Sequence, residues 1–353
     1  MKEQTAKKWF IKCMITLASL LGLVALIMII VDPYFHYHKP LSFLSYRLYE
    51  ERYINDGVAR HFDYDAIIAG TSMSQNFKTS EMDALFGTNS IKSCFSGAGY
   101  QEISQHLERS LNRNDSIHTI LWVLDYNGLL RNYDYQAYSD YPTYLYDNNF
   151  FNDAAYLFNK SIFYHGVLPC IPMTLSETPT TSMDEYSSWV RPSGLENIMA
   201  AYERDKIVKN DSAIFGPEEE ARVKQTINEN FIRVINQHPD VTFYIYYTPF
   251  SICHFDALKL EGIMEQQYSA EQLCTELLLE CPNVKLYGFF DQYDVICNTD
   301  YYTDPCHHSA EVNSMILNWI SKDIGRITKE NYLKKLNEEK AFYMNYDYEN
   351  LYK

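Results

Sequence analysis

The stretch DAIIAGTSMSQNF, residues 65–77, joins a short apolar run to a cluster of hydroxyl side chains. The apolar run is typical of a buried strand, and Gly70 allows a tight turn directly after it. Thr71, Ser72 and Ser74 follow, where we expect a helix to start. Hydroxyl residues commonly cap helices, but a serine here would also gain oxyanion stabilisation from helix N-terminal amides. This segment alone therefore leaves open whether Ser72 is a cap or a nucleophile.

Strand-like and helix-like patterns alternate around this stretch. The expected strands are residues 65–69, 90–95, 119–124, 241–247 and 284–289. The expected helices are residues 80–85, 101–111, 218–237, 269–280 and 310–327, with a loop over 298–309. The alternation predicts an α/β domain over residues 61–329, with a parallel sheet and helices on both faces.

The alternation of strand-like and helix-like segments stops between about residue 130 and residue 217, where the chain is irregular and rich in tyrosine. We interpret this segment as an insertion on the α/β core, because long loops on a rigid scaffold often carry binding function. Residues 330–353 are charged and Tyr-rich, and we expect a peripheral C-terminal tail there.

The N-terminus has the character of a membrane anchor. Residues 14–31 carry no charge, and they are preceded by lysines at positions 2, 7, 8 and 12. The positive side is expected to stay cytoplasmic, which places residues 1–12 inside, a transmembrane segment at 13–31 and the rest outside. A cleaved signal peptide is the alternative, but no small-residue cleavage site follows the apolar run. Residues 32–60, rich in Tyr, His and Pro, would form a juxtamembrane segment.

Composition limits the class of partner. The chain has 353 residues, enough for a well-buried core, and a formal net charge of −16. Such a charge argues against a nucleic-acid partner, because phosphates require a basic face. The 31 tyrosines suit wet binding surfaces, since each combines an apolar ring with a polar tip.

The eight cysteines do not form a dense disulfide pattern. One lies at the start of the membrane segment, and an odd number outside cannot all pair within the chain. A disulfide is possible between Cys274 and Cys281, or between Cys297 and Cys306, but spacing alone does not establish it. We expect mostly free, buried thiols.

A second candidate cluster, YYTDPCHHS, occupies residues 301–309. Asp304 and His307 lie three residues apart across a proline turn, so the carboxylate can orient an imidazole that activates a serine. Two alternatives remain: the histidines cap or pack at a helix start, or Asp304, Cys306, His307 and His308 hold zinc. No second ligand cluster supports the zinc site, and we expect no metal.

Two further segments follow expected strands and offer groups for an oxyanion. The glycines of SGAG, Gly97 and Gly99, would let backbone amides approach a reacting oxygen. Asn127, in the segment DYNG, would offer its side-chain amide. Each segment is also an ordinary turn sequence.

The order of these elements resembles the SGNH (GDSL-like) hydrolase superfamily, named after its Ser, Gly, Asn and His. The anchored layout is most similar to the membrane-bound bacterial branch that includes DltD and polysaccharide O-acyl-modifying enzymes. By position, Ser72 matches the nucleophile of that family, and Asp304 with His307 matches its Asp-x-x-His pair. Gly97 matches its glycine, with Gly99 as the alternative. Asn127 matches less closely, because the family usually has Gly-x-Asn-Asp there.

The resemblance implies a three-layer α/β/α sandwich and a serine esterase or O-acyltransferase. In it Ser72, His307 and Asp304 would be catalytic, and Ser72, Gly97 and Asn127 would form the oxyanion hole. It implies no cofactor, and its substrate would be an acyl ester of a cell-envelope polysaccharide. Two alternatives remain: an inactive member of the fold that binds glycan or a membrane protein partner, or a zinc protein.

Overall fold

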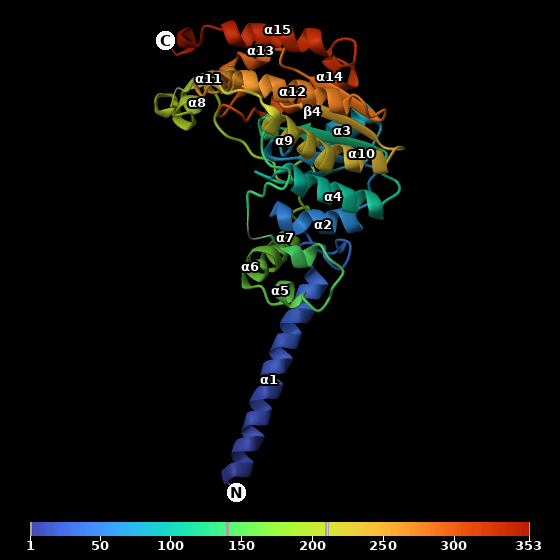
Figure 1. The fold of residues 1–353 in the computed structure, drawn as a ribbon. Helices are drawn as coiled ribbons and strands as arrows, with labels where there is room; N and C mark the ends of the chain where they lie inside the picture. The colour runs from blue at the N-terminus through green and yellow to red at the C-terminus, as the bar shows by residue number, and fades with distance from the viewer. Residues whose placement is uncertain (1, 139–140, 209, 211, 353) are drawn as a thin grey trace. The chain divides into compact units, whose positions relative to one another are not determined.

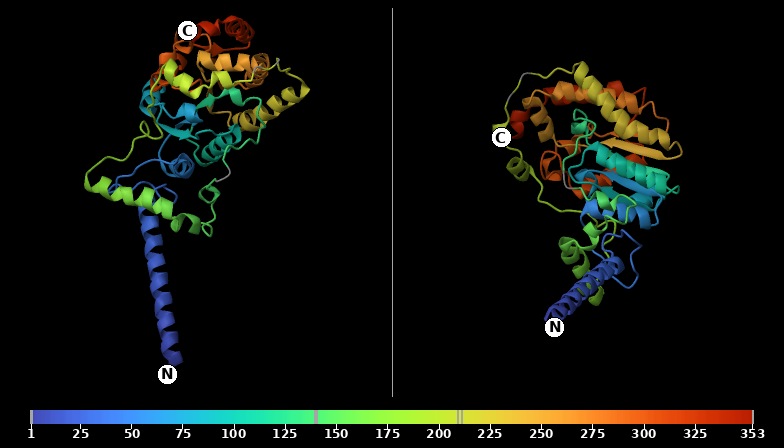
Figure 2. Two further views of the ribbon diagram at one scale, coloured as in Figure 1. Left: turned by 90° about the vertical axis from the view of Figure 1, so that its left-hand side faces the viewer. Right: turned by 60° about the horizontal axis from the view of Figure 1, so that its bottom comes forward.

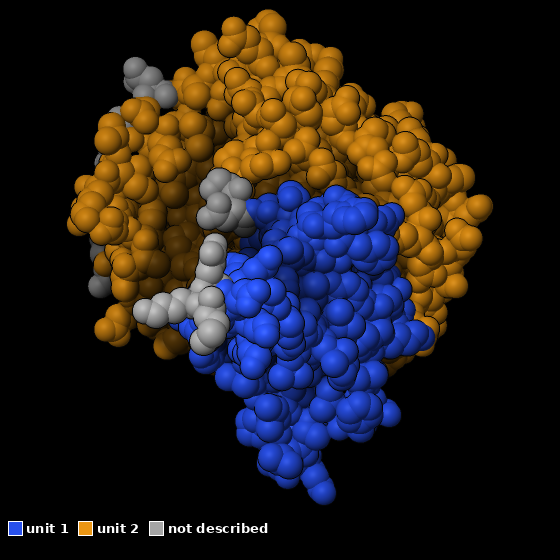
Figure 3. Space-filling model, turned by 90° about the horizontal axis from the view of Figure 1, so that it is seen from below, with its two compact units in different colours: residues 1–62, 140–182 blue, residues 63–139, 183–353 orange. Residues whose placement is uncertain are grey.

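The computed structural model describes residues 2–138, 141–208, 210 and 212–352, with backbone alone for Lys2, Glu3 and Asn127. The chain divides into two compact units, coloured separately in Figure 3. The first unit comprises residues 1–62 and 140–182, and the second comprises residues 63–139 and 183–353. The segment that we interpreted as an insertion, residues 130–217, therefore contributes to both units.

The first unit is built from helices (Figure 1). Its longest, α1, covers Lys2–Val31, and the part from Gln4 to Val31 is long and apolar enough to cross a membrane. The other helices are α2 (Glu51–His61), η3 (Thr143–Leu145), α5 (Ala154–Leu157), α6 (Lys160–Ile162), η4 (Phe163–Val167) and α7 (Leu168–Leu175). Both α5 and η4 contact α1.

The second unit is an α/β domain around one six-stranded sheet, in the order β2-β1-β3-β4-β5-β6. The strands are β1 (Ala66–Gly70), β2 (Ser90–Cys94), β3 (Thr119–Leu124), β4 (Thr242–Tyr247), β5 (Val284–Gly288) and β6 (Arg326–Ile327). The first five are parallel, and only β6 runs antiparallel. Every residue of β1, β2 and β3 is buried, as is usual in a parallel sheet covered on both faces, although β2 (SIKSC) includes Lys92 and two serines.

Helices surround the sheet (Figure 2). The longer ones are α3 (Thr79–Phe86), α4 (Tyr100–Arg113), α9 (Pro217–Ile227), α11 (Ile252–Leu260), α12 (Met264–Leu278), α14 (Ala310–Ser321) and α15 (Tyr332–Asn345). The shorter ones are η1 (Ser72–Ser74), η2 (Tyr126–Gly128), α8 (Leu195–Ala201), η5 (Arg204–Lys206), η6 (Asn228–Ile232), α10 (Arg233–Gln237), α13 (Tyr293–Ile296), η7 (Thr299–Tyr301) and α16 (Tyr348–Leu351). A π-helical turn, η6, joins α9 to α10, so the predicted helix over 218–237 is nearly continuous.

The core of the sheet is aromatic. Trp122 of β3 is fully buried and stacks on Phe231 of η6 with ring centroids 4.4 Å apart. Such a pair adds to the area that it buries, because offset stacking aligns the ring quadrupoles. The apolar stretch TILWVL thus forms the central strand and also anchors a helix to the sheet.

The predicted helix over 310–327 is too long. Helix α14 ends at Ser321, and Asp323 (φ 57°) and Gly325 (φ 80°) then reverse the chain. Only residues that tolerate a left-handed backbone, glycine above all, suit such a turn. Arg326 and Ile327 consequently pair with β5 as an antiparallel edge strand.

The segment that we expected to be peripheral, residues 330–353, takes part in the core through α15. The ring of Tyr343 is fully buried and stacks on Phe255 at 3.7 Å, and its hydroxyl donates to the Phe290 carbonyl.

All eight cysteines, each within the described part of the chain, are free.

Candidate active site

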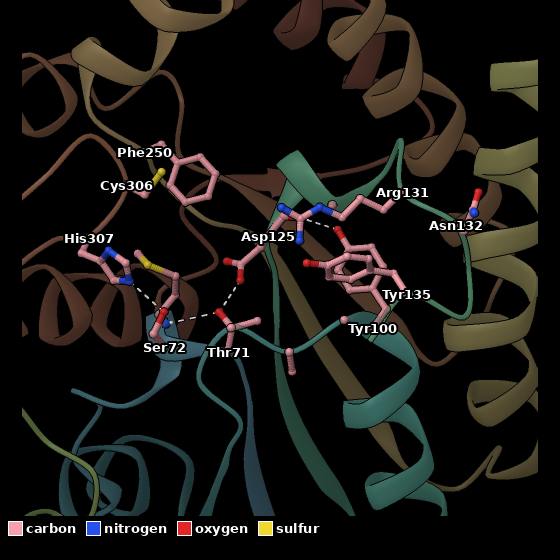
Figure 4. A pocket seen from close by; sticks show the side chains of 15 residues that line it. Thr71, Ser72, Tyr100, Asp125, Arg131, Asn132, Tyr135, Phe250, Cys306 and His307 are labelled. Carbon is pink, nitrogen blue, oxygen red and sulfur yellow. Dashed lines mark hydrogen bonds between the residues drawn. The ribbon is translucent and has the colours of Figure 1, made fainter. Parts of the chain in front are cut away.

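The carboxyl ends of β1, β2, β3 and β4 meet at one edge of the sheet, because these strands are parallel. The turns that follow them, together with the loop before α14, line a cavity of about 190 Å³. Figure 4 shows this cavity, which lies wholly within the second unit. Ligand sites of parallel sheets commonly lie at such an edge.

Ser72 reaches the cavity from the turn after β1. Gly70 closes that strand, and a Cβ atom there would lie 2.7 Å from Cβ of Val123, so only glycine fits. Ser72 opens the single turn η1, while the following α-helix begins at Thr79. The helix start that we expected at Ser72 is therefore a single short turn, whose amides are the ones that lie beside the hydroxyl.

Ser72 lies next to His307. The Ser72 hydroxyl is 2.7 Å from Nε2 of His307, and Nδ1 of the same ring is 2.8 Å from Oδ2 of Asp304 (Figure 4 shows the first of these hydrogen bonds). Both ring nitrogens thus have partners, which fixes the orientation of the imidazole between a hydroxyl and a carboxylate. This is the geometry of a nucleophile, a base and an orienting acid.

The carboxylate of Asp304 is held by its own loop. Its other oxygen accepts hydrogen bonds from the backbone amides of Cys306 and His307, at 2.9 and 2.8 Å. Burial works to raise the pKa of Asp304, but the hydrogen bonds and charge of His307 and these amides outweigh it, so the pKa lies below its usual value. Asp304 is therefore an anion at neutral pH, as an orienting group must be.

The loop itself is fixed at several points. The Thr303 amide donates to the His307 carbonyl at 2.9 Å, and the Tyr302 hydroxyl donates to the Pro249 carbonyl at 2.9 Å. The Ser251 hydroxyl donates to the carbonyl of Pro305 at 2.7 Å. The base is thus built on a loop that is tied to the end of β4.

Gly97 and Gly99 both line the cavity. Gly97 has a φ of 68°, a conformation that glycine adopts without strain, and the Tyr138 hydroxyl lies 3.2 Å from the position of an added Cβ. Close approach of the backbone to a ligand is possible there. The side chain of Asn127, the third predicted oxyanion group, lies outside the described part of the structure.

Asp125 is a residue of this edge that the sequence did not single out. It lines the cavity, and its carboxyl group accepts a hydrogen bond from the Thr71 hydroxyl (Figure 4). The Thr248 hydroxyl also donates to it, at 2.7 Å. Burial raises the pKa of this carboxyl group, although the two threonines and the charges of His307 and Arg131 oppose the rise. Its position directly after β3 could have identified it as a site residue, but Asn127 was the more conspicuous residue of that turn.

Trp189 is a second residue that the sequence did not single out. Its ring meets that of His307 nearly at right angles, with centroids 5.7 Å apart, and its amide donates to Oδ1 of Asn76 at 2.8 Å. The guanidinium of Arg191 covers the Trp189 ring at 4.9 Å. This tryptophan comes from the irregular segment, where no periodicity pointed to it.

His308 and Cys306 differ from His307 in role. His308 is buried, and burial lowers its pKa to about 4, so it is a neutral core histidine. Cys306 lines the cavity, but burial raises its pKa, which keeps the thiol protonated. Among the described residues, no group of three or more His, Cys, Asp and Glu side chains is arranged to hold a metal ion.

Comparisons of the chain with models of protein families, with curated proteins and with solved structures return no match. The functional argument therefore rests on the geometry of this site.

Proposed function

We propose that this chain is a membrane-anchored serine esterase or O-acyltransferase that works through an acyl-enzyme on Ser72. The observation that carries the proposal is the continuous hydrogen-bonded series Ser72–His307–Asp304 at the wall of a cavity. A serine hydroxyl is a weak nucleophile at neutral pH, and an oriented imidazole is the group that activates it.

In the first half-reaction, Ser72 Oγ attacks the carbonyl carbon of an acyl ester while its proton passes to Nε2 of His307. The tetrahedral oxyanion is stabilised by backbone amides of the turns at Ser72 and Gly97, and Asn127 is the proposed third donor. His307 then returns the proton to the departing alcohol, which leaves the acyl group on Ser72. Asp304 holds the imidazole in place and offsets its transient charge.

In the second half-reaction, water or a sugar hydroxyl attacks the acyl-Ser72 ester and gives its proton to His307. His307 returns this proton to Ser72 Oγ as the bond between that oxygen and the acyl carbon breaks. Water yields a free acid and an esterase, whereas a sugar hydroxyl yields a new ester and a transferase. The cavity of about 190 Å³ is smaller than the roughly 300–1,000 Å³ of sites for drug-sized ligands, which favours a short acyl group.

The strand order supports the proposed fold family, and the lysines near the N-terminus support the proposed membrane topology. A parallel sheet in the order β2-β1-β3-β4-β5, with helices around it, supports the three-layer α/β/α sandwich and the SGNH family. The lysines in the N-terminal part of α1, before its uncharged stretch, support a cytoplasmic N-terminus and an extracytoplasmic second unit. An enzyme anchored outside the membrane has the acyl esters of cell-envelope glycopolymers within reach, and these are the proposed substrate class.

The test is turnover of a short p-nitrophenyl ester by the full-length chain in detergent micelles. We expect measurable hydrolysis, abolished in Ser72→Ala and unaffected in Ser116→Ala, a variant at an exposed serine of the same unit. Adding a glycan acceptor distinguishes the two enzymes, because a transferase then forms an acyl glycan. Equal turnover by Ser72→Ala would refute the catalytic assignment.

One observation favours a second candidate, a non-catalytic protein that binds glycan or a membrane partner. The carboxyl group of Asp125 lies in the same cavity and is joined through Thr71 to the turn that carries Ser72. When ionised, it would oppose a neighbouring oxyanion. A serine-reactive fluorophosphonate discriminates the two, since only an activated Ser72 would react with it.

A further inference from the structure

Several large apolar side chains of the first unit are exposed outside α1. Phe151 is 96% exposed, Leu175 80%, Phe150 76%, Phe43 67% and Ile171 52%. Isolated exposed apolar residues are common, but five of them within one small unit require an explanation. Ile171 and Leu175 lie one helical turn apart on α7, so they share a face, while Cys170 beside Ile171 is buried.

These side chains belong to helices that adjoin the C-terminal end of α1. Both α5 and η4 contact α1, and Figures 1 and 2 show α5, α6 and α7 beside the end of that helix. Asp32, the first residue after α1, accepts hydrogen bonds from the Tyr37 amide at 2.7 Å and from the Tyr156 hydroxyl at 2.8 Å. The helices are therefore fixed to the point where the apolar span ends.

The last turn of α1 indicates the depth of α5 and η4 in the bilayer. Met28 is fully buried within the first unit, whereas its neighbours Ile29 and Ile30 are 39% and 46% exposed. One side of this turn is thus covered by protein, and the other side is apolar and open. If α1 spans a bilayer, the open side lies in lipid, and α5 and η4 lie at the same depth, at the edge of the hydrocarbon region.

The charge distribution fits a membrane surface. The chain carries 46 acidic residues, yet residues 33–49, which carry Phe43, and 154–176, which carry Ile171 and Leu175, contain none. Phe151 lies outside these segments, between the exposed Asp147 and the buried Asp153. The charged side chains in these segments are basic or histidine, and Lys39, Arg47 and Lys160 among them are exposed. Phosphate headgroups attract such segments, and the missing carboxylates remove the repulsion that the net charge of −16 would otherwise cause.

We propose that the first unit is a membrane-interface platform, in which the exposed apolar residues around α7 and Phe151 insert between lipid headgroups beside α1. Interfacial helices bury an apolar face roughly 5–10 Å below the headgroups, while basic side chains stay at the surface. The partner is the lipid bilayer itself. The proposal takes α1 as membrane-spanning and does not depend on the catalytic proposal.

The experiment uses the full-length chain in nanodiscs of phosphatidylcholine and phosphatidylglycerol. Phe151→Trp and Leu175→Trp place a fluorophore in the platform, and Ile214→Trp, at a residue of the second unit that is 82% exposed, is the matched control. The fluorescence of the unsubstituted protein is subtracted, because Trp9 lies within α1. Circular dichroism checks that each variant folds.

We expect the added fluorescence of the Phe151→Trp and Leu175→Trp variants to shift to the blue and to be quenched by brominated lipids, most strongly when bromine is near the top of the acyl chain. The Ile214→Trp signal should show neither effect. Quenching equal to that of the control would overturn the proposal. A blue shift without quenching would overturn it too, because it would show that protein, a second copy of the chain, covers the surface.

Discussion

The Nε2 atom of His307 lies 2.7 Å from the Ser72 hydroxyl, although the two residues are 235 positions apart in the chain. Strand β1 carries Ser72 to one edge of the parallel sheet, and the loop before α14 brings His307 to the same edge. Asp304 completes the series at 2.8 Å. The account of function depends on this convergence.

Replacing Asp304 by Asn should lower kcat for a short ester by about 10³–10⁴-fold, because the amide cannot hold the imidazole in the tautomer that accepts the serine proton. The KM should change little, since Asp304 does not line the cavity. Asp300→Asn, in the same loop but exposed, is the control. A kcat within a factor of about ten of the wild type would argue against an orienting role.

Replacing Trp189 by Ala should lower kcat by about 10–100-fold, because the His307 ring loses the edge contact that fixes its plane. Trp189→Phe should recover most of the loss, since an aromatic ring can restore the contact. Val190→Ala, at a neighbour that is 99% exposed, should behave as the wild type. If Ala and Phe variants match each other, then Trp189 does not position His307.

Stability of the second unit should fall as the pH rises from about 4.5 to about 8, because Glu339 is buried and its pKa is raised to about 8. Burial likewise raises the pKa of Glu271, whose Oε2 has no hydrogen-bond partner in the described structure. A raised pKa in the folded state means that folding favours the protonated form. The stabilisation is complete below the unfolded value of 4.5 and lost as the pH passes about 8.

The loss should be on the order of 4 kcal/mol in the free energy of unfolding, measured by urea denaturation of the full chain at several pH values. Glu339→Gln should flatten this dependence, and Glu338→Gln, at an exposed neighbour, should leave it nearly intact. A slope that Glu339→Gln does not change would show that other groups set the pH dependence.

Tyr343→Ala should destabilise the second unit by about 3–5 kcal/mol, because it empties the buried space against Phe255. Tyr343→Phe should cost only about 1 kcal/mol, the contribution of the hydrogen bond to Phe290. Chemical denaturation measures both. A negligible cost for the Ala variant would mean that α15 is not part of the cooperative core.

The central strands could be predicted because they are short runs of mostly apolar and aromatic residues, of which TILWVL over Thr119–Leu124 is the clearest. By contrast, β2 (SIKSC) contains two serines and a lysine, and β6 has only two residues. The end of α14 could not be predicted, because Asp323 and Gly325 take left-handed conformations that the apolar period does not reveal. The same holds for α15, whose buried Tyr343 and Glu339 resemble the residues of a solvated tail.

At the site, motif order was enough to pair Ser72 with Asp304 and His307, because turns after parallel strands converge. Asp125 and Trp189 escaped prediction for different reasons. Asp125 stood beside an Asn-Gly pair, which is the more conspicuous turn signal. Its carboxyl group forms hydrogen bonds with Thr71 and Thr248 because β3 lies between β1 and β4 in the sheet. Trp189 lies in a segment without periodicity, so its contact with His307 depends on tertiary packing alone.

Peptide mapping after fluorophosphonate treatment of the full-length chain shows whether His307 activates Ser72. We expect one modified peptide, phosphonylated at Ser72, in the wild type and in Ser116→Ala. We also expect strongly slowed modification in His307→Ala and none in Ser72→Ala. Modification at another serine, or no modification of the folded wild-type protein, would contradict the claim that His307 activates Ser72.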